Sequence, residues 1–237
     1  MKYMLTTLIW ILLAIHPARA QPVSIELVLA IDTSASVNDM EYRLQMRGIA
    51  AALESDELIE AIGLHEKGVA LALLQWSGGL LGTVTVDWTV ISSPASIRAL
   101  ARRIATTPRA NTGNYTAIGN AIRRATEMLE TNSQTGDYRR IDVSGDGRNN
   151  SGEHPALARE AAVARGITVN GLAILDGDIA LAAYYRSHVA GGSGSFVLSA
   201  DRFDDFAKAM RRKLGRELSI QLSDKRDGEN RWAQAAN

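Results

Sequence analysis

Short apolar runs alternate with helical patterns from residue 25 to about residue 218, and this alternation constrains the fold more than any other feature. Most runs are bounded by polar residues, as expected of strands buried on both faces of a sheet. One run alternates with polar residues through Val84, Val86, Trp88 and Val90, which indicates an edge strand. The predicted strands are residues 25–31, 69–74, 84–90, 140–144, 167–175 and 196–198.

The segments between these runs have apolar residues at helical spacing. The first helix is predicted to begin at Asn38, with Glu41 three residues later, which is the spacing of a capping box. The other predicted helices are residues 97–104, 117–132, 155–165, 179–189 and 202–214. The basic run Arg211-Arg212-Lys213 is interpreted as the solvated face of the last helix. Strands and helices in alternation predict an α/β fold, with a doubly wound, mostly parallel six-stranded sheet, one antiparallel edge strand and helices on both faces.

The two ends of the chain are predicted to lie outside this domain. Residues 1–20 have a basic start, an apolar run that is too short to span a bilayer, and Ala18-Arg19-Ala20 at a cleavage position. We interpret them as a cleaved signal peptide, so the protein is expected to be exported and to be periplasmic or secreted. Residues 21–219 form one predicted domain. Residues 220–237 are polar without periodicity and are predicted to be a disordered tail.

Composition excludes several classes of protein. The chain has no cysteine, so neither disulfides nor a lipid-modified cysteine can hold or anchor it. The 26 basic and 26 acidic residues balance, and removal of residues 1–20 would take away Lys2 and Arg19 but no acid. The mature chain would then be slightly acidic, and nucleic-acid-binding domains usually have a basic patch. A nucleic acid is therefore not an expected partner.

The loop after the first predicted strand has the chemistry of a metal site. Ligands bind beyond the carboxyl ends of the strands in doubly wound sheets, and Asp32-Thr33-Ser34-Ala35-Ser36 lies at that position. It has no glycine, and the chain has no GxxxxGK[ST] motif, which argues against a nucleotide site. One carboxylate and two hydroxyls are hard oxygen ligands suited to Mg²⁺, Mn²⁺ or Ca²⁺. Serine and aspartate are also common cap residues, so this loop alone is weak evidence.

Two further loops have oxygen-bearing residues at the same predicted edge of the sheet. Thr116 opens the predicted helix 117–132, and Asp146 directly follows the strand that ends near Ser144. Taken singly, Thr116 could be a plain N-cap and Asp146 a turn residue in a Gly-Asp-Gly bend. Because all three loops would converge at one edge, a shared metal site is the favoured interpretation.

These residues resemble the von Willebrand factor type A family, which includes the integrin inserted domains. That family combines an Asp-x-Ser-x-Ser loop with a threonine and an aspartate from two other loops in a metal-ion-dependent adhesion site. The matching positions are Asp32, Ser34, Ser36, Thr116 and Asp146. The resemblance covers residues 24–218, and the chain looks like a bacterial branch of the family. Tyr115 and Gly145 depart from it, because the family often has a small residue at the first position and threonine or serine at the second.

The resemblance implies a Rossmann-like fold and a non-enzymatic binding protein. It implies one divalent cation, Mg²⁺ first and Mn²⁺ or Ca²⁺ as alternatives, which captures a protein or peptide partner through a carboxylate. In the family, capture can be coupled to a shift of the last helix. Tyr115, Asn149 and His154 are the predicted partner-binding rim. Two alternatives stay open: a metal-dependent hydrolase with His154 or Glu153 as general base, and a structural module in which the ion holds loops together.

Overall fold

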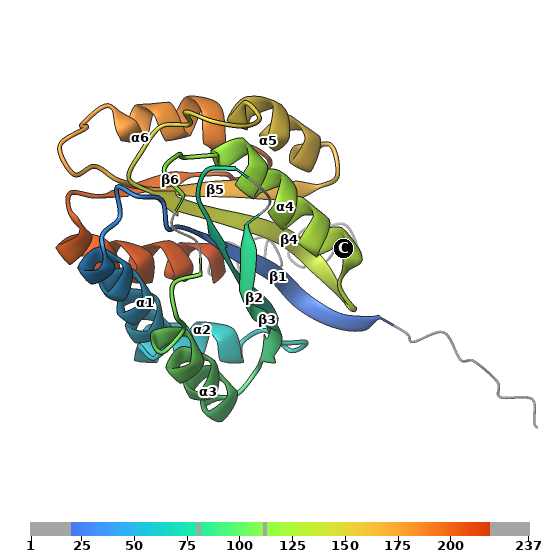
Figure 1. The fold of residues 1–237 in the computed structure, drawn as a ribbon. Coiled ribbons are helices and arrows are strands. Elements are labelled where there is room, and N and C mark those ends of the chain that lie inside the picture. The colour runs from blue at the N-terminus through green and yellow to red at the C-terminus, as the bar shows by residue number, and fades with distance from the viewer. Residues whose placement is uncertain (1–19, 80–81, 111–112, 219–237) are drawn as a thin grey trace, which may run out of the picture.

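The computed structural model of the protein describes residues 20–79, 82–110 and 113–218 (Figure 1). Its centre is a six-stranded sheet in the order β3-β2-β1-β4-β5-β6. Every neighbouring pair is parallel except β2 and β3, so the predicted fold class, including the antiparallel edge strand, is confirmed. The strands are β1 (Gln21–Asp32), β2 (Val69–Trp76), β3 (Thr83–Ile91), β4 (Gln134–Gly145), β5 (Ile167–Ile174) and β6 (Val197–Ala200).

Helices cover both faces of the sheet in three layers (Figure 1). One face packs against α1 (Asp39–Leu53), α2 (Asp56–Gly63), α3 (Pro94–Ala105) and a last helix of residues 206–218, which follows a 3₁₀ turn at Phe203–Asp205. The other face packs against α4 (Ile118–Thr131), α5 (Pro155–Val163) and α6 (Leu181–Tyr184), which continues as a π-helix over Tyr185–Val189.

The central strand β1 shows why the apolar runs are continuous. Leu27 and Leu29 face the hydrophobic cluster beneath α1 and the last helix, whereas Val28 and Ala30 face the cluster beneath α4 and α5. Successive side chains of a strand point to opposite faces, so a strand covered on both sides is apolar at most positions. The predicted capping box at the start of α1 is present, with Asn38 and Glu41 exchanging hydrogen bonds with each other's backbone amides.

Several elements differ from their predicted bounds. Helix α2 was not predicted, and β4 begins at Gln134 rather than near residue 140 because its first half is a partly exposed extension. Helix α4 begins at Ile118 with Ala117 as its N-cap residue and no side-chain cap hydrogen bond. The plain N-cap interpretation of Thr116 is therefore wrong.

The interpretation of Lys213 as part of a solvated face is also wrong, because its side chain is fully buried. Its ammonium group pairs with Asp142 of β4 and lies 3.5 Å from Glu217 on the last helix. Glu217 also pairs with Arg140 of β4 at 2.6 Å and accepts a 2.6 Å hydrogen bond from Asn170 of β5. Two buried cations thus neutralise two buried anions, and Arg211 and Arg212 alone face solvent as predicted.

The predicted signal peptide and tail lie outside the described residues, apart from Ala20. Within the part of the chain that the structure describes, no helix has the length and apolarity needed to cross a membrane.

Candidate metal site

The sheet brings two of the three predicted loops to the same edge. Strands β1 and β4 are parallel neighbours with Ile31 opposite Ser144, so Asp32 and Gly145 end their strands side by side. Asp146 follows directly. Thr116 lies just before α4, which packs over β1 and β4.

Hydrogen bonds connect the first loop to the third. The backbone amide of Ser34 donates to Oδ1 of Asp32 at 2.8 Å, and the hydroxyls of Ser34 and Ser36 lie 3.2 Å apart. The Ser36 hydroxyl then donates to Oδ1 of Asp146 at 2.8 Å. Residues 110 positions apart in the sequence therefore share one polar cluster.

The second loop joins the other two. The amide of Thr116 donates to the Asn150 side chain at 2.8 Å, and the amide of Asn150 donates back to the Thr116 carbonyl at 3.0 Å. The Thr116 hydroxyl lies 3.5 Å from where a Cβ on Gly147 would stand, next to Asp146. The amide of Ala35 donates to the Gly113 carbonyl at 3.0 Å, which ties the first loop to the second. All three loops are thus linked to one another.

Burial perturbs both carboxyl groups of this cluster. It raises the pKa of Asp32 to about 7, helped by the negative charge of Asp146 and opposed by hydrogen bonding from Ser34 and by the charge of Arg109. Burial also raises the pKa of Asp146, against the hydrogen bond from Ser36. Among the described residues, Oδ2 of the fully buried Asp32 has no hydrogen-bond partner. Buried oxygens without a partner are rare in folded proteins, so this oxygen is available to bind an ion.

The oxygen donors present fit a hard divalent cation. The cluster has two carboxylates and three hydroxyls, from Asp32, Asp146, Ser34, Ser36 and Thr116. The described residues contain no group of three or more His, Cys, Asp or Glu side chains that could hold an ion. A cation here would therefore rest on hydroxyl oxygens as much as on carboxylates, which suits Mg²⁺, Mn²⁺ or Ca²⁺ better than a softer metal.

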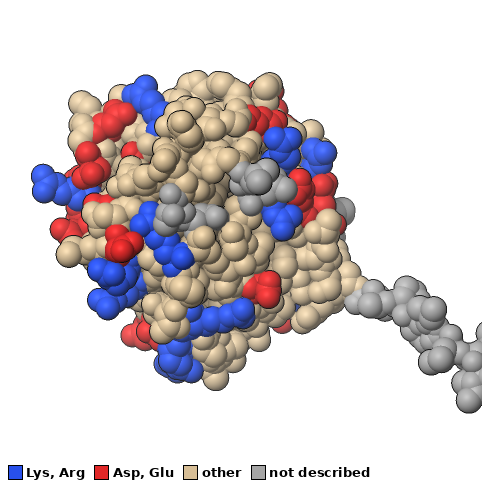
Figure 2. Space-filling view, viewed as in Figure 1, with Lys and Arg blue, Asp and Glu red and all other residues tan. Residues whose placement is uncertain are grey.

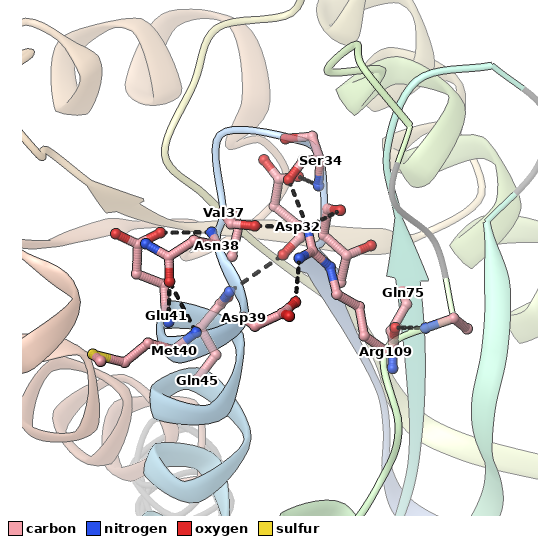
Figure 3. Close-up of polar contacts among 12 residues, drawn as sticks. Asp32, Ser34, Val37, Asn38, Asp39, Met40, Glu41, Gln45, Gln75 and Arg109 are labelled. Carbon is pink, nitrogen blue, oxygen red and sulfur yellow. Dashed lines mark hydrogen bonds and ion pairs between the residues drawn. The ribbon is translucent and has the colours of Figure 1, made fainter.

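The partly buried Arg109 holds the first loop in place through hydrogen bonds, and sequence reasoning missed it (Figure 3). One nitrogen of its guanidinium donates to the carbonyls of Thr33 and Ser34, both at 2.9 Å, and to that of Val37 at 2.6 Å. The other terminal nitrogen pairs with Asp39 at 3.1 Å. The planar fork of arginine suits such multiple contacts, so it fixes the path of the loop that bears Asp32 and both serines. Arg109 lies 76 positions along the chain from Thr33 and belongs to no recognisable motif, so the sequence does not indicate this contact.

The three predicted rim residues lie in different surroundings. Tyr115 is 59% exposed and stands beside Gly78. The side chain of Asn149 accepts from the amide of Gly119 at 3.3 Å, so it helps to hold α4 in place. His154 caps the start of α5 and packs edge-on against His188, with 5.6 Å between ring centroids. Of the three, only Tyr115 combines wide exposure with a place directly next to a predicted ligand.

A family model described as "Protein of unknown function (DUF1194)" matches residues 22–222 of the chain. No curated protein sequence matches it.

Solved structures share the fold at low sequence identity. Proximal thread matrix protein 1 from the mussel byssus has a TM-score of 0.65 at 16% identity, over 84% of this chain and 49% of that one; a further structure of it has a zinc-occupied MIDAS motif. The conserved hypothetical protein BatB from Bacteroides thetaiotaomicron has a TM-score of 0.58 at 19% identity, over 84% of this chain and 100% of that one. The vWF domain of the type V pili tip protein Mfa5 from Porphyromonas gingivalis has a TM-score of 0.57 at 13% identity, over 84% of this chain and 96% of that one.

This chain spans about half the length of the mussel protein. Likeness at these identities shows the fold alone, and that fold is the von Willebrand factor type A fold.

Proposed function

Since the chain belongs to the family described as "Protein of unknown function (DUF1194)" and has the von Willebrand factor type A fold, we propose that it is a non-enzymatic binding protein with one metal-ion-dependent adhesion site. The observation that carries the proposal is that three linked loops surround the buried carboxylate of Asp32, whose Oδ2 has no hydrogen-bond partner among the described residues. The proposed ligands are Asp32, Ser34, Ser36, Thr116 and Asp146. The zinc-occupied MIDAS motif of the mussel protein supports a divalent metal in this fold.

The donor set determines what a bound cation would do. The carboxylates of Asp32 and Asp146 would balance the charge of a divalent ion, and the other three proposed ligands are neutral hydroxyls, which are weak donors. Five ligands leave one position of an octahedral ion open, so the ion would stay electrophilic enough to take an anionic group from outside. Mg²⁺ is the proposed ion because it favours oxygen ligands, with Mn²⁺ as the nearest substitute. The proposed partner is a protein or peptide that offers a carboxylate to this ion. The pili tip domain with the same fold supports a protein partner in general.

The face of the molecule in Figure 2 gives no sign of a strongly charged partner. On the face in Figure 2, Lys and Arg are interspersed with Asp and Glu, in keeping with the balanced composition. Recognition is therefore proposed to come from the ion and its nearest neighbours, with the exposed ring of Tyr115 as an aromatic contact. Export to the periplasm or beyond, through the predicted signal peptide, is part of the same proposal.

Neither of the two residues named for the hydrolase alternative, Glu153 and His154, is positioned as a general base for this site. The Glu153 carboxylate pairs with Arg123 of α4 at 2.6 Å. His154 accepts from the amide of Ala156 at 3.3 Å and contacts His188, and no described contact joins it to Asp32 or Asp146. A general base must lie within hydrogen-bond reach of the proton that it takes. A purely structural ion remains the alternative that experiment has to separate from partner capture.

The test is metal-dependent capture by immobilised protein. A protein extract from the cells that produce this protein, and from their medium, is applied to the immobilised protein in Mg²⁺ or Mn²⁺. Bound proteins are then eluted with EDTA. We expect a partner that is retained with metal, released by EDTA and lost with Asp146→Ala. The control Asp137→Ala removes an exposed aspartate at the far end of β4 and should retain it.

A partner retained equally with EDTA would refute capture through the ion. If metal stabilises the immobilised protein but no partner is retained, the result would instead support the alternative in which the ion only holds the loops together. If retention is confirmed, Tyr115→Ala should weaken it without changing the metal affinity.

A further inference from the structure

Tyr185 lies in a slot that two glycines open beneath the proposed metal site. A Cβ added to Gly171 of β5 would stand 2.8 Å from Cδ1 of the Tyr185 ring, and one added to Gly145 of β4 would stand 2.8 Å from its hydroxyl. Real Cβ atoms essentially never come so close, so both strands need glycine for the ring to lie between them. The ring therefore runs under two adjacent strands and ends at the last residue of β4.

The same glycine brings the Tyr185 hydroxyl next to Asp32. The Cβ position at Gly145 lies 2.8 Å from the Tyr185 hydroxyl and also 2.8 Å from Oδ2 of Asp32. Both side chains are fully buried. In the described part of the chain, neither of these two oxygens has a hydrogen-bond partner. Two unpaired buried oxygens, one a donor and the other an acceptor, thus flank one Cα.

The backbone at Tyr185 also departs from regular helix. Helix α6 ends at Tyr184 and continues as a π-helix, in which the amide of Ala190 donates to the Tyr185 carbonyl at 2.9 Å. Such π-helical turns are uncommon and often occur at functional sites. Here the wide π-helical turn begins at Tyr185 itself. The turn and the two glycines together place the Tyr185 hydroxyl beside the Asp32 carboxylate.

We propose that Tyr185 is a positioning residue of the metal site, whose hydroxyl donates the hydrogen bond that Oδ2 of Asp32 lacks. This inference rests on the proposed function, because it concerns the carboxylate that would serve the ion. The bond belongs to the metal-bound protein, in which Asp32 is ionised and its carboxylate has about four acceptor sites, so Oδ2 can accept from Tyr185 and still serve the ion. The bond holds Asp32 with Oδ1 toward Ser34 and offsets part of the cost of a buried negative charge when the metal is bound.

The proposal predicts opposite behaviour for metal affinity and for stability without metal. Without metal the hydroxyl is a buried, unpaired group, so its removal should cost little or no stability. With metal bound, loss of a group that orients a ligand typically lowers affinity by about 10- to 100-fold. A residue with a merely structural role would lower stability and leave affinity unchanged.

The experiment compares the wild type with Tyr185→Phe and with the control Tyr138→Phe. Tyr138 is a partly exposed tyrosine toward the other end of β4. Calorimetric titration with Mn²⁺ and with Mg²⁺ gives the affinities, and urea unfolding in EDTA gives the stability without metal. We expect affinity at least about tenfold weaker for Tyr185→Phe alone, with metal-free stability equal to that of the wild type.

The possible results separate a failure of the positioning role of Tyr185 from a failure of the metal site itself. If the wild type binds metal and Tyr185→Phe binds it equally well, the positioning role is refuted while the metal site stands. If Tyr185→Phe loses stability in EDTA and keeps its affinity, the residue is structural only and the proposal is again refuted. If the wild type binds neither ion, the proposed function fails and this inference fails with it.

Discussion

Replacing Lys213 with methionine removes an ammonium group from a fully buried ion network while keeping most of the side-chain length. The network links the last helix to β4 and β5 through Arg140, Asp142, Asn170 and Glu217, none more than 6% exposed. Without Lys213, Asp142 would lose its ion-pair partner and stay buried near the like charge of Glu217. Breaking a buried ion pair on one side costs about 3–5 kcal/mol.

The expected loss is large enough to measure in two ways. For a domain of this size, about 1 kcal/mol corresponds to about 2–4 °C in Tm, so Lys213→Met should lower Tm by about 6–20 °C. Urea unfolding should show the same loss of free energy. The control Lys208→Met changes an exposed lysine on the same helix and should stay within about 0.5 kcal/mol of the wild type.

The loss should also grow with pH. Burial raises the pKa of Asp142 to about 6, while the charge of Lys213 opposes that rise. An acid whose folded pKa lies above its unfolded value makes stability fall as pH rises between the two. Without Lys213 the folded pKa moves further up, so this fall continues above pH 6. Lys213→Met should therefore be closer to wild type at about pH 5 than at about pH 8.

A second substitution tests the cause. Asp142→Leu in the Lys213→Met background replaces the broken pair with apolar side chains and should recover most of the loss, since buried ion pairs replaced in this way are often neutral or stabilising. A Lys213→Met protein as stable as Lys208→Met at every pH would refute the reasoning. It would mean that the network adds nothing to the attachment of the last helix.

Three further outcomes follow from the site and its surroundings. Gly119→Ala should cost about 1–3 kcal/mol in urea unfolding, because its Cβ would stand 2.1 Å from the Glu153 carbonyl oxygen; unchanged stability would contradict this packing. Mg²⁺ affinity measured by calorimetry should weaken as pH falls below about 7, because a proton competes for Asp32, whose pKa is about 7; affinity independent of pH between about 5 and 8 would count against Asp32 as a ligand. Arg109→Gln should weaken metal affinity by about tenfold or more, while the exposed control Arg102→Gln should not; equal affinities would show that the loop keeps its path without the guanidinium.

The layout of the sheet could be predicted because it depends on local periodicity. A strand covered on both faces is apolar at most positions, and the alternating run of β3 marks the edge. The order of these runs then places Asp32 and Asp146 at one edge by geometry alone. The helix that follows Thr116 differs from its predicted bounds by one residue at each end. Helix ends depend on backbone hydrogen bonds that the amino-acid sequence specifies loosely.

Contacts between distant residues could not be predicted in the same way. Lys213 belongs to a run of basic residues, and only the packing of the last helix on β4 shows that it is buried. Arg109 and Tyr185 act on the first loop from segments 76 and 153 positions away from the residues that they approach, and neither belongs to a motif. Gly145 is visible in the sequence, but the reason for a glycine there is the phenol that lies against it.

Thermal unfolding of the purified protein in EDTA and then in Mg²⁺, Mn²⁺ and Ca²⁺, beside Asp146→Ala, tests the proposed metal site most directly. At about 100 times its Kd, a bound ion stabilises by about 2.7 kcal/mol, which corresponds to a rise in Tm of about 5–10 °C. The proposed metal site predicts such a rise for the wild type with Mg²⁺ or Mn²⁺, and none for Asp146→Ala. A wild-type Tm that stays the same in EDTA and in millimolar concentrations of all three ions would contradict it.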